Sequence, residues 1–159
     1  MNLNECLTSG RKQAALLAGV AVALWAGASA VQAQNAGASL EVVVPQLRNA
    51  QGGLGCQLFA GANGFPMKGD QALQTVSSPI SNGTARCRFQ PVPPGTYAVA
   101  VVHDENGNQK LDSNLLGVPT EGYGVSNNRT YAMSQPRWDE SRFDLVAGET
   151  RQLTIQLRY

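Results

Sequence analysis

Oxygen-bearing side chains are densest in the segment HDENGNQKLDSNLLGVPTEGYGVSNN, from His103 to Asn128. In its first half they recur at alternate positions, as in loops that wrap a single Ca²⁺. Asp104, Asn106, Asn108 and Asp112 take the first, third, fifth and ninth positions, and Lys110 offers its main-chain carbonyl at the seventh. Carboxylate, amide and carbonyl oxygens suit hard Ca²⁺ better than they suit zinc. The spacing therefore predicts a calcium loop over residues 104–112.

Two positions depart from the calcium pattern. Position six, where a sharp turn usually needs glycine, is Gln109, and the glycine is displaced to Gly107. Position twelve, usually a bidentate glutamate, is Leu115, so that Glu121 is the nearest further carboxylate. We therefore expect weak affinity, ~10⁻⁴–10⁻³ M. The alternative is a loop bonded only to itself, because aspartate and asparagine side chains accept hydrogen bonds from nearby backbone N–H groups.

His103 is the only histidine, and Glu121 and Tyr123 follow it in the same segment. Together they could serve a small hydrolase or a carbohydrate-active enzyme. A nucleophilic site also needs a serine or thiol beside a base, and the sequence has no G-x-S-x-G elbow. A single imidazole makes a poor zinc site, and a histidine at a strand end often bridges hydrogen bonds. We predict a non-catalytic chain with no catalytic residue, and keep the enzyme as the alternative.

The second half of the segment contains glycine turns, Tyr123 and the pair Asn127 and Asn128. Loops carried by a rigid sheet are where binding usually resides, so we regard His103, Glu121, Tyr123, Asn127 and Asn128 as candidate binding residues. An envelope protein or a surface glycan would be the partner. A purely structural connection between strands is the other interpretation.

Short segments with apolar residues at every second position flank this loop. They cover residues 39–47, 54–60, 84–89, 96–102, 142–146 and 151–158, with Gly- or Pro-containing turns between most of them. Residues 71–80 are ambiguous and could begin with a helical turn and end as a further strand. This pattern, without an amphipathic helix, predicts an all-β chain: one antiparallel β-sandwich of about seven strands. The first two segments are joined by a short turn and should form an antiparallel hairpin. Residues 96–102 should form a central strand, buried on both faces.

Cys56 and Cys87 both lie in alternating segments and share their faces with apolar residues. Both thiols should therefore point into the same core. In an oxidising compartment an isolated pair is a disulfide candidate, and the alternative is two buried thiols that do not meet.

The N-terminus has the layout of a secretory signal peptide. Arg11 and Lys12 precede the uncharged apolar run AALLAGVAVALWA. Val31-Gln32-Ala33 then resembles a cleavage site, and Ala28-Ser29-Ala30 is a second option. The run is shorter than the ~20 residues that cross a bilayer, although an uncleaved anchor is an alternative. We expect residues 1–33 to be removed, leaving a domain at 34–159 that is periplasmic or secreted and has no transmembrane segment.

The charges of the expected mature chain balance. The whole sequence holds 12 basic and 11 acidic residues, and Arg11, Lys12 and Glu5 lie in the segment to be removed. A net charge near zero argues against nucleic acid as a partner.

The stretch PPGTYAVAVVHDENGNQKLDSNLLGVPTEGYGVSNN (residues 93–128) closely resembles the bacterial exported family called domain of unknown function 2141. The leader, the GFP at residues 64–66 and the terminal LTIQLRY also fit that family, which usually has glycine where this chain has Gln109. The resemblance covers about residues 39–159. It implies an immunoglobulin-like or transthyretin-like sandwich and no established activity.

Overall fold

The computed structural model describes residues 37–129 and 134–159. Within them the chain forms eight strands and three short helices. In chain order these are β1 (Ala38–Val44), β2 (Gly53–Phe59), η1 (Gly69–Gln71), β3 (Gln74–Ser78), β4 (Ala85–Val92), β5 (Gly95–Asp104), β6 (Gly122–Val125), η2 (Ser126–Asn128), α2 (Trp138–Ser141), β7 (Phe143–Leu145) and β8 (Thr150–Thr154).

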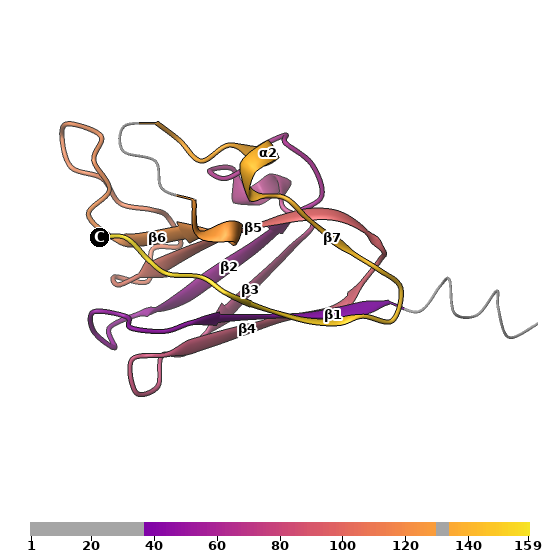
Figure 1. Ribbon diagram of the computed structural model, residues 1–159. Coiled ribbons are helices and arrows are strands. Elements are labelled where there is room, and N and C mark those ends of the chain that lie inside the picture. The colour runs from indigo at the N-terminus through magenta and orange to yellow at the C-terminus, as the bar shows by residue number, and fades with distance from the viewer. Residues whose placement is uncertain (1–36, 130–133) are drawn as a thin grey trace, which may run out of the picture.

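The strands form two facing sheets (Figure 1). One has three strands in the order β4-β1-β8, and the other has the order β3-β2-β5-β6, with β7 also paired to β5. All pairings are antiparallel except that of β1 with β8, which is parallel. The predicted all-β sandwich is confirmed, with eight strands in place of about seven.

Alternation of side chains builds the core between the sheets. Strand β1 alternates buried and half-buried residues along its whole length, and β2 does so up to Leu58. The inward residues include Leu40 and Val42 from one sheet and Leu54, Leu58 and Val99 from the other, all fully buried. Each such side chain contributes roughly 1.5–3 kcal/mol by leaving water. Strand β5 is buried on both faces from Tyr97 to Val101, as its composition predicts.

The predicted hairpin between the first two alternating segments is wrong. Strand β1 pairs with β4 and β8, whereas β2 pairs with β3 and β5 in the other sheet. The chain leaves β1 at Pro45, which has no N–H to continue a ladder, and Gln46 takes a positive φ of 58°. The N–H of Leu47 then bonds to the carbonyl of Gly83, 3.0 Å away. This turn carries the chain from one sheet to the other.

A disulfide joins Cys56 of β2 to Cys87 of β4, and both residues are fully buried. Because β2 and β4 belong to different sheets, the bond links the two layers covalently. The predicted pairing is confirmed.

The expected signal peptide, residues 1–33, lies outside the described residues. Among the residues that are described, none of the helices has the length and apolar character needed to span a bilayer.

Candidate functional site

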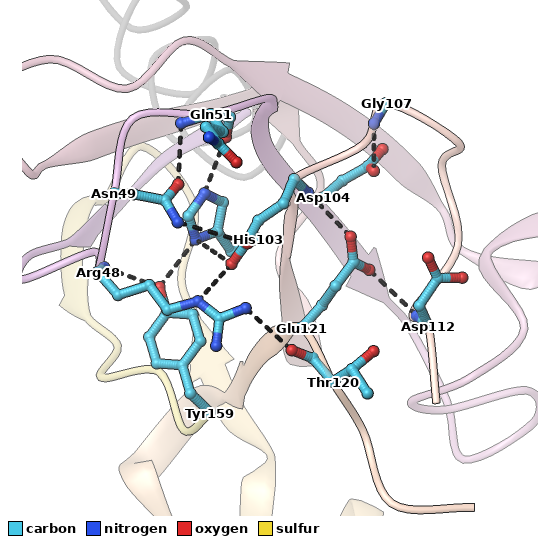
Figure 2. Close-up of polar contacts among 11 residues, drawn as sticks. Arg48, Asn49, Gln51, His103, Asp104, Gly107, Asp112, Thr120, Glu121 and Tyr159 are labelled. Atoms are coloured by element: carbon cyan, nitrogen blue, oxygen red, sulfur yellow. Dashed lines mark hydrogen bonds and ion pairs between the residues drawn. The ribbon is translucent and has the colours of Figure 1, made fainter. Parts of the chain in front are cut away.

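His103 lies near the end of β5, and its side chain is fully buried (Figure 2). Its Nε2 is 3.0 Å from the carbonyl oxygen of Gln51, and its Nδ1 is 2.8 Å from the hydroxyl of Tyr159. A carbonyl oxygen can only accept, so Nε2 carries a proton and donates it. The backbone N–H of Arg48 donates to the same hydroxyl of Tyr159, 3.1 Å away. In the neutral ring, Nδ1 therefore accepts from the Tyr159 hydroxyl, and the imidazole bridges two distant segments of the chain.

Glu121, at the base of the long loop, is 4% exposed. Its two carboxylate oxygens accept hydrogen bonds from the backbone N–H groups of Glu105 (2.9 Å) and Asp112 (3.1 Å). Figure 2 shows the carboxylate between Asp104, at the end of β5, and Asp112, further along the loop. Glu121 therefore fastens both ends of the calcium-like loop to its base, and neither carboxylate oxygen is left without a donor.

Glu105 and Arg48 form an ion pair close to His103. The Nε of Arg48 donates to Oε1 of Glu105 over 2.6 Å, and its Nη2 donates to the carbonyl of Thr120 over 2.9 Å. The guanidinium also stacks on the ring of Tyr159, 4.4 Å from the centroid. The hydrogen bond from Arg48 is the main cause that lowers the pKa of Glu105, and the same bond raises the pKa of Arg48. Nδ1 of His103 lies 3.6 Å from the same Oε1.

Because of this ion pair, we expect the free energy of unfolding to depend on pH in the acid range. Because folding lowers the pKa of Glu105 below its ordinary value of 4.5, its contribution is present above that pH and is lost as pH falls through the folded pKa. We expect Arg48→Met to destabilise the protein more at pH 7 than at pH 3, measured by urea unfolding. Arg86→Met removes an arginine from an exposed pair with Glu41 and should show the smaller pH dependence of the two. Equal destabilisation by Arg48→Met at both pH values would contradict this role.

The carboxylate of Asp104 organises the first turn of the loop. Its Oδ1 accepts from the N–H groups of Gly107 (2.8 Å) and Asn108 (3.1 Å), and its Oδ2 accepts from the N–H of Gln109 (2.7 Å). Three backbone donors are therefore satisfied by one side chain.

The remaining oxygen-bearing residues of the loop bond to each other. The side-chain amides of Asn106 and Asn108 donate to the carboxylate of Asp112 over 2.6–3.1 Å. The amide oxygen of Asn108 accepts from the N–H of Lys110, 2.8 Å away. Among the described residues, no group of three or more His, Cys, Asp or Glu side chains is placed to hold a metal ion. The spacing thus brings the predicted residues together, and the loop satisfies its own polar groups.

Gln109 occupies the turn position at which calcium loops have glycine, and its φ is +61°. The φ of Gly107 is +78°, so both residues lie in the left-handed region. A side chain with a Cβ costs about 1–2 kcal/mol there. The chain therefore keeps the sharp turn of such loops although it lacks the glycine.

Replacing Gln109 by glycine should stabilise the protein by about 0.5–1 kcal/mol, because removing the Cβ relieves more strain than the added chain entropy costs. Urea unfolding of Gln109→Gly and of wild type measures the difference. Gln109→Ala keeps the Cβ and should bring no gain. A loss of stability in Gln109→Gly would show that the turn is not strained.

The other candidate binding residues point elsewhere. Tyr123 pairs with Val102 and belongs to the outer face of the sheet, whereas its neighbours in the ladder, His103 and Gly122, belong to the inner face. The amide of Asn127 donates to the carbonyls of Glu140 and Arg142. The side chain of Asn128 bonds to the main chain of Thr154 and Gln156. Asn127 and Asn128 thus connect segments, and only Tyr123 faces open space.

That space is a groove of about 1480 Å³ over the outer face of the five-stranded sheet. Its floor includes Gly55, Gln57, Ser77, Val102 and Tyr123, and residues 66–70 and 107–119 contribute its walls. Figure 1 shows α2 and the segment before β3 on this same side of the sheet, away from β1 and β4. The sequence did not predict the groove, because its walls come from segments far apart in the chain. The glycines of β2 were the one signal in the sequence, since a strand seldom has small residues along one face without a reason.

Comparison with protein families matches residues 42–153 to a family of uncharacterised proteins conserved in bacteria, domain of unknown function 2141. The chain belongs to this family. The domain of unknown function 2141 match begins within β1 and ends within β8, so it includes the disulfide, the loop and most of the groove. The resemblance carried by residues 93–128 is thereby confirmed. Comparisons with curated proteins and with solved structures gave no match.

Proposed function

We propose that this chain is an exported, non-catalytic binding or structural module. The observation that carries the proposal is that His103 and Glu121 are buried and that all four of their polar side-chain atoms are engaged in hydrogen bonds within the chain. A catalytic acid or base must reach the proton that it transfers. Neither side chain offers an atom to a substrate.

The alternative enzyme would need His103, Glu121 and Tyr123 around one open pocket. Tyr123 lies on the outer face of the sheet and His103 on the inner face, so the sheet itself separates their side chains. This separation favours the non-catalytic proposal over a hydrolase or carbohydrate-active enzyme.

Export is supported by two features. The disulfide between Cys56 and Cys87 is of the kind that persists in oxidising compartments. The N-terminal sequence has the order of basic, apolar and small residues that signal peptides have.

Turnover of chromogenic substrates tests the non-catalytic proposal. Purified protein, residues 34–159, is incubated with p-nitrophenyl esters and p-nitrophenyl glycosides beside a His103→Gln variant. We expect both proteins to leave the substrates at the background rate. Hydrolysis by the wild type that His103→Gln abolishes would overturn the proposal.

Weak calcium binding by residues 104–112 is a second proposal. It is favoured by the left-handed turn at Gln109, which is the backbone shape that calcium loops need at that position. Asp104 and Asp112 would supply carboxylates, Asn106 and Asn108 amide oxygens, and Lys110 its carbonyl. To bind a cation, the amides of Asn106 and Asn108 must give up their hydrogen bonds to Asp112.

Thermal melting with millimolar calcium, and with a chelator, tests this second proposal. An ion that binds only the folded form raises the melting temperature by mass action. Asp112→Asn should abolish any such rise, while Asp139→Asn, an exposed aspartate on α2, should keep it. Identical melting curves with calcium and with chelator would leave the loop as a purely self-bonded turn.

A further inference from the structure

The groove on the outer face of the five-stranded sheet has the dimensions of a site for a polymer. Its volume of about 1480 Å³ exceeds the ~300–1000 Å³ of most small-molecule sites. Its floor follows β2 over residues 53–57, which span roughly 16 Å at about 3.3 Å per residue. An extended segment of roughly five residues has the same length.

The charges along the groove favour an uncharged occupant. On its floor, the strand residues that face outward are small, apolar or neutral polar, as Gly55, Gln57, Ala100 and Val102 illustrate. Among the described residues that line the groove, ionised side chains lie only at the margins, where Lys68 is accompanied by Asp70, and Lys110 by Asp104. Each margin therefore holds one charge of either sign, and neither recruits an anion or a cation.

The walls present apolar side chains to water. Met67 is 53% exposed on one wall, and Leu116 and Val118 are 87% and 54% exposed on the other. The wall that holds the last two is preformed, because Oδ1 of Asn114 accepts from the N–H groups of both Leu116 and Val118 at 3.0 Å. A rigid apolar wall loses little entropy when an apolar group covers it, so it favours binding.

Several polar side chains on the floor have no hydrogen-bond partner within residues 37–129 and 134–159. Those of Gln57, Thr75, Ser77 and Tyr123 make no hydrogen bond to any other described residue. Their amide and hydroxyl groups supply uncharged hydrogen-bond donors and acceptors along the floor. An occupant that fits both the floor and the walls needs neutral hydrogen-bonding groups along its length together with apolar side groups, and an extended polypeptide has both.

We propose that the groove binds an extended, uncharged segment of another polypeptide, with about five residues inside the groove and apolar side chains against Met67, Leu116 and Val118. This inference rests on the proposed non-catalytic binding role and specifies its partner. The β2 and β5 ladders at the floor are already paired on both sides. The segment is therefore held on the face of the sheet by side chains and does not add to it as a further strand.

Gly55 gives a substitution that fills the groove without disturbing the fold. A Cβ at Gly55 would meet only the carbonyl oxygen of Val102, at 3.8 Å. Gly55→Leu should therefore project its side chain into the groove. Gly61→Leu is the matched control, since a Cβ there meets nothing within 4 Å and Gly61 does not line the groove. Leu116→Ser tests the apolar wall, and thermal melting confirms that all three variants fold.

The experiment uses an array of N-acetylated, C-amidated heptapeptides in which Val, Leu or Ala alternates with Ser, Asn, Glu or Lys. We expect the folded protein to bind peptides of the Ser and Asn sets in preference to the Glu and Lys sets. Gly55→Leu and Leu116→Ser should weaken binding at least tenfold, and Gly61→Leu should bind as the wild type does. Maltoheptaose and octyl glucoside serve as a neutral glycan and a neutral amphiphile without a peptide backbone.

Failure to bind any peptide at millimolar concentration would overturn the proposal, as would binding that Gly55→Leu leaves intact. Binding of maltoheptaose or octyl glucoside, without binding of peptides, would overturn the choice of a polypeptide. The same proteins are tested for turnover of the chromogenic substrates. Absence of peptide binding without turnover leaves the non-catalytic proposal standing, whereas turnover that depends on His103 overturns that proposal by itself.

Discussion

Replacing Cys56 and Cys87 together by alanine should lower the free energy of unfolding by about 3–4 kcal/mol. The two residues are 31 positions apart, and in the chain-entropy model a cross-link of that length removes about this much conformational freedom from the unfolded chain. The bond also joins β2 to β4 across the core, so its loss removes the cross-link between the two sheets. Urea unfolding of the mature protein measures the change.

A reducing agent gives the control for this prediction. Reduced wild type keeps both sulfur atoms in the core, so a similar fall in its stability would assign the effect to the cross-link and not to lost volume. The free energy of unfolding of the double alanine variant should not change when the reductant is added. A difference of less than about 1 kcal/mol between oxidised and reduced wild type would contradict a disulfide that stabilises the sandwich.

Glu121→Ala should destabilise the protein by about 2–4 kcal/mol. The substitution removes the acceptor of two backbone N–H groups, those of Glu105 and Asp112, in a position that is 4% exposed. A donor left without an acceptor costs about 1–3 kcal/mol. Both ends of the segment 105–112 lose their attachment at once, so we expect a large effect from a residue outside the hydrophobic core.

Two variants check that explanation by chemical denaturation. Glu121→Gln keeps one of the two oxygens and should recover about half of the lost stability. Glu140→Ala, which removes an exposed carboxylate from α2, should change stability by less than about 0.5 kcal/mol. If Glu121→Ala costs no more than Glu140→Ala, the loop is not fastened through Glu121.

The sequence predicted the fold class, the buried β5 strand and the disulfide, because all three depend on local alternation of side chains. The faces of Cys56 and Cys87 could be assigned from the residues two positions away on either side. Pairing between strands depends on distant segments, so the expected hairpin of β1 and β2 is wrong. The chain passes from one sheet to the other after β1 because Pro45 has no N–H and Gln46 takes a left-handed φ. Of these two features, only Pro45 can be recognised in the sequence.

In the candidate site too, a local pattern predicts some contacts, and others depend on residues far apart in the sequence. The Asx-rich run from Asp104 to Asp112 is local, and its residues come together as the spacing predicts. The partners of His103 are Gln51 and Tyr159, 52 and 56 positions away, and no local pattern identifies them. The groove also combines distant segments, which is why Tyr123 could be singled out while its surroundings could not.

We propose that His103 is a fixed hydrogen-bond bridge and not a reactive group. The most direct measurement is a long-range ¹H–¹⁵N NMR spectrum of the His103 imidazole. The carbonyl of Gln51 requires the proton on Nε2, so we expect one Nε2–H tautomer with a slowly exchanging ring proton. Averaged signals from two tautomers, with a ring proton in rapid exchange with water, would contradict it.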